Sequence, residues 1–167
     1  FIERMLRVIG DEIQQIKLTK RVDSLLVDTV VDFIRIYADR THHGKEEDIL
    51  FRDLRKRPLS DGDQRIMEEL IEEHSLGRQI TNALFDANML YRSGEKFALD
   101  EITHNFQALV DLYPRHIEKE DNVFFPAART YFTDEEDMNM LTEFWDFDRK
   151  MIHEKYKSVV EKLLNKK

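Results

Sequence analysis

Two histidine and glutamate pairs in the chain share one spacing. Glu46 follows His42 by four residues, and Glu120 follows His116 by four residues. Residues four apart lie one above the other on a helix, so an imidazole and a carboxylate at this spacing can reach the same ion. The chain has no cysteine, so any metal must be held by nitrogen and oxygen atoms. The two pairs therefore indicate a metal site built from facing helices.

The helical period predicts which of these side chains face the interior. On a regular helix His42 shares its face with apolar residues, namely Val31, Ile34, Ala38, Ile49 and Leu50. His116 and His74 also lie on largely apolar faces. His43 and Glu47 lie about 100° round the wheel, among charged residues, so we expect them near the rim.

A metal would explain why two glutamates face an apolar core. Burying an ionised glutamate costs several kcal/mol unless a charge compensates it, and few lysines or arginines are placed to do so. One or two dications would supply that charge. The alternative is a buried histidine and glutamate hydrogen-bond network without metal. Arg78, one turn after His74, would pair with a glutamate in that network, or would support a metal ligand from outside.

The elements that must position these residues are all helical. Apolar residues recur at three and four positions through most of the chain, and glycine and proline are scarce. We predict helices at about 1–18, 22–55, 61–91, 97–131 and 134–165, separated by capping and breaking residues. The predicted fold is an all-α, up-down-up-down four-helix bundle over about 1–131 with an additional C-terminal helix, in one domain spanning 1–167.

The composition excludes some partners. The chain has 167 residues, and its 34 acidic and 26 basic side chains give a net charge of −8, which argues against a nucleic-acid partner. No apolar run approaches the roughly 20 residues of a membrane span, and no signal-peptide pattern opens the chain. We therefore expect a cytoplasmic protein with no membrane partner. The sequence does not specify an oligomeric state.

Three stretches resemble the hemerythrin-like, or HHE cation-binding, family of four-helix bundles. They are HHGKEEDILF around His42, EHSLGR around His74 and HIEKEDNVFFPAA around His116. The resemblance spans about 1–131 and implies a non-haem centre with two iron ions inside the bundle. It assigns His42, Glu46, His74, His116 and Glu120 as ligands, with both glutamates bridging. Zinc or manganese could occupy the same ligands in a recombinant preparation.

Some positions depart from the family pattern. Arg78 stands where hemerythrins proper carry a second histidine on the third helix, so one iron would have a more open coordination. His43 is a further candidate ligand, because some members place one directly after the second-helix histidine, and His153 of the last helix is another. The family's first-helix histidine is absent. We expect it one or two residues upstream of Phe1.

The resemblance implies a metal-binding protein that binds O2 or senses O2, redox state or iron. O2 is then the expected small ligand, and we favour a binding protein over an enzyme. Two alternatives stay open. One is an enzyme that uses the same centre to act on O2, peroxide or nitric oxide, and the other is a metal-free helical interaction module.

Overall fold

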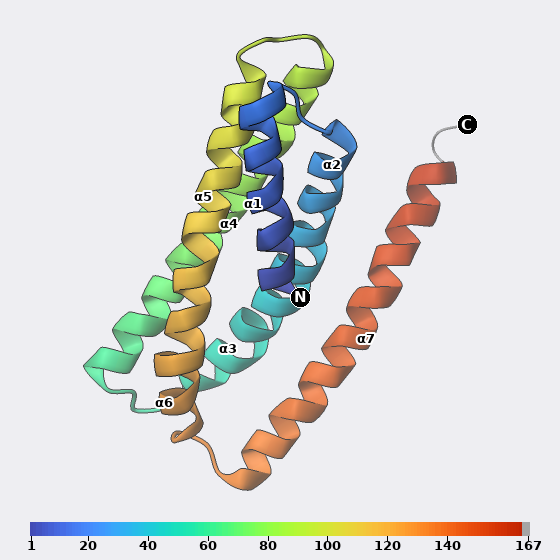
Figure 1. Ribbon diagram of the computed structural model, residues 1–167. Helices are drawn as coiled ribbons and strands as arrows, with labels where there is room; N and C mark the ends of the chain where they lie inside the picture. Colours follow the sequence, from blue (N-terminus) through green and yellow to red (C-terminus); the bar gives the residue numbers. More distant parts are fainter. Residues whose placement is uncertain (165–167) are drawn as a thin grey trace.

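The computed structural model describes residues 1–164, which form helices and short loops without any strand (Figure 1). The predicted all-α class is confirmed. The first, third and last predicted helices are α1 (Ile2–Thr19), α4 (Asp61–Arg92) and α7 (Asp134–Leu164). Position 165, where the last predicted helix ends, lies outside the described residues. None of the described helices is long and apolar enough to span a membrane.

The second and fourth predicted helices are helical rods made of several segments. The second rod comprises α2 (Ser24–Phe33), η1 (Ile34–His43), η2 (Glu46–Leu50) and α3 (Phe51–Leu54). The fourth comprises α5 (Ala98–Lys119), η3 (Glu120–Phe124) and α6 (Phe125–Arg129). The η segments are π-helical, with backbone hydrogen bonds between residues five apart. The amide of Gly44, for example, donates to the carbonyl of Asp39.

Side-chain caps define where these helices begin. The Asp23 carboxylate accepts from the backbone amides of Leu25 and Leu26 at the start of α2. The Ser60 hydroxyl accepts from the amide of Asp63 at the start of α4. Thr133 and Glu136 form a reciprocal capping box at the start of α7. These caps satisfy amides that have no partner inside the helix.

The helices bury two apolar clusters, one in each half of the bundle. In Figure 1, α4 runs the length of the bundle beside α5 and the α2–α3 rod, and α1 covers only one half. The first cluster lies where α1 packs and includes Ile9, Val27, Leu84 and Phe106. The second lies at the other end and includes Ile49, Phe51, Leu70 and Phe124. The polar site described below lies along the rods between these two clusters.

Helix α7 lies outside the other helices and contacts η1 and η2 (Figure 1). Ion pairs tie it to the second rod, including Lys45 with Asp148 at 2.9 Å and Arg52 with Glu143 at 2.7 Å. Gly44 makes room for the ring of Phe147, because a Cβ at position 44 would lie 2.9 Å from Cζ of that ring. Helix α7 therefore rests on the segment that carries the adjacent histidines.

Candidate metal centre

Six side chains form two groups whose donor atoms lie close enough to hold metal ions. One group is His43, His74 and His116, and the other is His42, Glu46 and Glu120. Within each group the donor atoms lie within 4.8 Å of one another. We call these the three-histidine group and the carboxylate group. The second rod, α4 and the α5–η3 rod all contribute to them.

The two adjacent histidines belong to different groups, and their predicted burial was wrong. His43 is buried, at 2% exposure, whereas the side chain of His42 is 36% exposed. The prediction assumed 3.6 residues per turn throughout the rod. The π-helical turns of η1 contain an extra residue, which rotates the following side chains around the axis and brings His43 inward. Its ring stacks on that of His74, with centroids 3.8 Å apart.

Each glutamate directs one oxygen toward each group. Oε1 of Glu46 lies 3.6 Å from Nε2 of His42, and its Oε2 lies 3.3 Å from Nε2 of His74. Oε2 of Glu120 lies 3.9 Å from Nε2 of His42, and its Oε1 lies 3.0 Å from Nε2 of His116. The two carboxylates therefore span the gap between the groups, as bridging ligands of a two-metal centre would.

Carboxylates outside the centre hold the opposite ring nitrogens of two histidines. Nδ1 of His74 lies 2.8 Å from Oε1 of Glu47, and Nδ1 of His116 lies 2.8 Å from Oε2 of Glu73. Such contacts fix the ring and leave Nε2 directed inward, which is the usual support of a metal-bound histidine. Sequence reasoning missed Glu73, although it directly precedes His74, because its contacts with His116 and Lys119 form only when α4 and α5 pack together.

Arg78 and His153 were predicted to lie near the centre. Nη2 of Arg78 donates to Glu47 at 2.6 Å, and its Nε donates to Asp39 at 2.7 Å. Arg78 thus contacts the carboxylate that holds His74 and does not contact the donor groups themselves. His153 lies exposed on α7 and belongs to neither group.

The pKa values of two buried histidines, His43 and His74, are shifted in opposite directions. Burial lowers the pKa of His43 to about 4, since the contact with Asp39 only partly offsets it. Burial also opposes the charged form of His74, but the carboxylates of Glu120, Glu46 and Glu47 outweigh it and raise the pKa to about 10. Without a metal, His74 is therefore protonated at neutral pH and His43 is neutral.

The two buried carboxylates also differ from each other. Burial raises the pKa of Glu46, and the nearby Glu120 carboxylate raises it further. Burial acts the same way on Glu120, but the contacts with His116 and His74 outweigh it and lower the pKa. Two carboxylates this close cannot both ionise readily without a compensating charge. A dication would remove this conflict.

Several buried nitrogen and oxygen atoms that could bind a metal lack a hydrogen-bond partner in the described residues. They are Nε2 of His74 and His116, both ring nitrogens of His43, both oxygens of Glu46 and Oε1 of Glu120. A metal-free network would satisfy such atoms, because an unpaired buried polar atom costs about 1–3 kcal/mol. The closeness of one such atom from each residue, and their nitrogen and oxygen chemistry, fit bound divalent metal ions.

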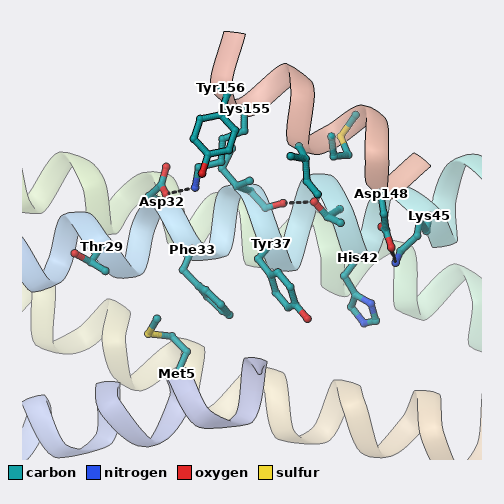
Figure 2. A pocket seen from close by; sticks show the side chains of 14 residues that line it. Met5, Thr29, Asp32, Phe33, Tyr37, His42, Lys45, Asp148, Lys155 and Tyr156 are labelled. Atoms are coloured by element: carbon teal, nitrogen blue, oxygen red, sulfur yellow. Dashed lines mark hydrogen bonds and ion pairs between the residues drawn. The ribbon is translucent and has the colours of Figure 1, made fainter. Parts of the chain in front are cut away.

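The exposed side of His42 faces a cavity between the second rod and α7. Figure 2 shows His42 at one end of this cavity, with Phe33 and Tyr37 along the same rod and Met5 opposite them. The cavity has a volume of about 730 Å³. Two ion pairs of α7, Asp32 with Lys155 and Lys45 with Asp148, lie along its edge (Figure 2). His42 is thus the member of the carboxylate group that borders this cavity.

A helical bundle with buried histidines and glutamates grouped between its helices defines a class of metal-binding bundle proteins. Residues 2–128 match the hemerythrin HHE cation binding domain. The chain therefore belongs to the hemerythrin HHE cation-binding family, whose members bind metal ions, typically iron. Helix α7 begins at Asp134, after the last matched residue, and the sequence resemblance is confirmed.

Curated relatives include uncharacterized proteins from Mycobacterium tuberculosis and Mycobacterium bovis. Each is 24% identical over 164 residues, which cover 97% of this chain and 63% of the relative. The chain thus spans less than two thirds of the length of these relatives. No solved structure matches the chain.

Proposed function

We propose that the chain holds two iron ions, one in each group of donors, and uses them to bind O2 reversibly or to respond to O2 or redox state. The observation that carries this proposal is the placement of the Glu46 and Glu120 oxygens, one from each residue toward each group. A single-metal site would not need both carboxylates to lie between His42 on one side and the three-histidine group on the other. The family match supports iron as the metal.

The proposed role of iron is to bind O2 and to exchange electrons with it. The protein's own residues would fix the ions and control their surroundings. Neutral imidazoles of His42, His43, His74 and His116 would supply nitrogen ligands, and the glutamates would neutralise charge. The buried rings of Phe51 and Phe124 lie beside the centre, with the Phe51 ring 6.0 Å from that of His74. These rings would limit water at the site.

Anaerobic loading with ferrous iron tests the proposal directly. We expect two iron ions per chain by elemental analysis, and fewer than one in a Glu46→Gln, Glu120→Gln double variant. Exposure to O2 should change the visible absorption spectrum, and removal of O2 should restore it. A chain that binds no iron would overturn the proposal.

The same experiment separates binding from catalysis. Rapid consumption of O2, peroxide or nitric oxide by the iron-loaded chain would support the enzyme alternative. Failure to bind any divalent metal would leave the metal-free interaction module. Loading with zinc or manganese provides a control for metals that occupy the donors without reacting with O2 in the same way.

A further inference from the structure

Helix α7 has a second apolar face that the bundle does not cover. Its first face packs on the bundle through Met140, Phe144 and Phe147. On its other side large apolar side chains stay exposed, and these are Met138, Leu141, Trp145, Ile152, Tyr156 and Val160. Trp145, the one tryptophan of the chain, is 66% exposed. We call these six residues the α7 stripe.

The α7 stripe runs along one side of the helix. At about 100° per residue, its six members fall within an arc of about 100°. The centre of this arc lies about 140° round the helix from the residues that pack on the bundle, and Figure 1 shows α7 on the outside of the other helices. The stripe is about 33 Å long at a rise of about 1.5 Å per residue. An exposed apolar patch of this extent indicates a protein interaction site.

The charge of α7 changes sign halfway along the helix. Residues 134–148 include seven carboxylates and no lysine or arginine. Residues 149–164 include five lysines and arginines and two carboxylates. The change falls between Asp148 and Arg149, which is also the middle of the α7 stripe. The helix therefore has an acidic half and a basic half of similar length.

The bundle neutralises only part of this charge. Ion pairs with the bundle join Glu136 to Arg57, Asp137 to Arg129, Glu143 to Arg52, Asp148 to Lys45, Glu154 to Arg40 and Lys155 to Asp32.

Among the described residues, Asp134, Glu135 and Asp146 pair with no cation of the bundle. Arg149 and Lys150 pair only with carboxylates of α7 itself, Asp146 and Glu154. The charge that the bundle leaves unmatched is thus acidic in the first half of α7 and basic in the second.

We propose that the α7 stripe binds a second copy of this chain, with the two α7 helices antiparallel. A two-fold axis near Arg149 would place the acidic half of each helix against the basic half of the other. Trp145 would then lie beside Ile152 of the second copy, and Leu141 beside Tyr156. A parallel pair would instead bring like charges together along the whole helix, so charge selects the antiparallel arrangement.

The expected association is reversible. A contact along one helix face is smaller than the roughly 800 Å² per partner that a standard interface buries, so we expect a dimer that forms at micromolar concentrations. Exposed tryptophans commonly dominate the binding energy of such contacts. Trp145 should therefore carry much of the affinity.

Sedimentation velocity over a range of concentrations tests the dimer. Emission of the single tryptophan should shift to shorter wavelength as the dimer forms, because Trp145 leaves water. Trp145→Lys should weaken association by about tenfold or more. Met89→Lys is the matched control, since Met89 is also half exposed but lies on α4. Circular dichroism would establish that both variants fold.

Cysteine cross-linking tests the orientation, because the chain has no cysteine of its own. An oxidised mixture of Leu141→Cys and Tyr156→Cys chains should form a disulfide between the two variants. Each variant alone should cross-link poorly, since an antiparallel pair holds its two identical cysteines about 22 Å apart along the axis. A parallel pair would give the opposite result.

This inference is independent of the proposed function, because no residue of the α7 stripe belongs to the donor groups. Metal-free and zinc-loaded chains should associate equally. A chain that stays monomeric at all concentrations would overturn the proposal. So would a dimer that Trp145→Lys leaves intact, or one that Met89→Lys weakens as much. Cross-linking of each cysteine variant with itself would overturn the antiparallel arrangement.

Discussion

At the scale of single residues, the centre depends on where each histidine directs its second nitrogen. His74 and His116 face inward because Glu47 and Glu73 hold their Nδ1 atoms. His42, Glu46, His74, His116 and Glu120 could be proposed from the sequence, since spacing and apolar faces select them. The outer carboxylates could not, because contacts between different helices do not follow from the period of any one helix.

The Glu73 carboxylate should control metal affinity without touching the metal. We expect Glu73→Gln to weaken metal binding by about 10–100-fold, because His116 loses the partner that orients its ring. Equilibrium dialysis against a competing chelator would measure the change. Glu69→Gln is the matched control, since Glu69 also pairs with Lys119 but lacks the contact with His116. Equal effects of the two variants would contradict the prediction.

The raised pKa of His74 predicts how pH affects the metal-free chain. Its folded-state pKa of about 10 lies above the unfolded value of about 6.5. Its contribution to stability is therefore complete below pH 6.5 and is lost as pH rises toward 10. Urea unfolding between pH 6.5 and 10 should show a falling free energy of unfolding.

Two comparisons isolate this effect. Metal loading should flatten the pH dependence, because the metal replaces the proton on His74. The exposed His104→Gln variant should keep the slope of the unmodified metal-free chain. A metal-free chain whose stability does not fall over this range would contradict the assigned pKa.

At the scale of elements, the π-helical segments determine which side chains reach the centre. A helix of regular period would place His42 inward and His43 near the rim, as the sequence predicted. The wider turns of η1 instead direct His43 inward, where it joins the three-histidine group, and direct His42 toward a cavity. The five helices followed from apolar periodicity and capping residues, whereas the change of helix type left no comparable pattern in the sequence.

The contact between Gly44 and Phe147 should govern how α7 packs. We expect Gly44→Ala to displace the Phe147 ring and weaken the packing of α7 by about 1–3 kcal/mol. Hydrogen exchange of the α7 amides should become faster while that of α4 stays the same. The added methyl group should have little effect when Phe147 is also changed to Ala, because the ring that it displaces is gone.

Gly62→Ala provides the control for this helix effect. A Cβ at position 62 would meet only the Ser60 hydroxyl, at 3.7 Å. This variant should therefore leave the exchange of α7 unchanged. Faster exchange in both glycine variants would show that the effect is not specific to the contact with Phe147.

At the scale of the whole molecule, the polar centre divides the core. The apolar cluster around Ile9 and Phe106 lies on one side of it, and the cluster around Phe51 and Phe124 lies on the other. Without metal, the layer between them contains buried donor atoms that lack partners. The two halves of the bundle should then be joined less strongly than a continuous apolar core would join them.

Metal should therefore change the form of the unfolding transition as well as its midpoint. We expect the metal-free chain to unfold in two steps in scanning calorimetry and the metal-loaded chain in one step at a higher temperature. Gln substitution at both Glu46 and Glu120 should restore the two-step behaviour in the presence of metal. A single transition for the metal-free chain would contradict this expectation.

The two buried carboxylates would have a structural role as well as a chemical one. Glu46 belongs to the second rod and Glu120 to the fourth. Metal ions bound between them would connect these two rods to α4 through His74. The metal ions and ligands that would give the centre its reactivity would then also hold the two halves of the core together. Loss of metal would weaken the contact between the two halves of the bundle at its middle.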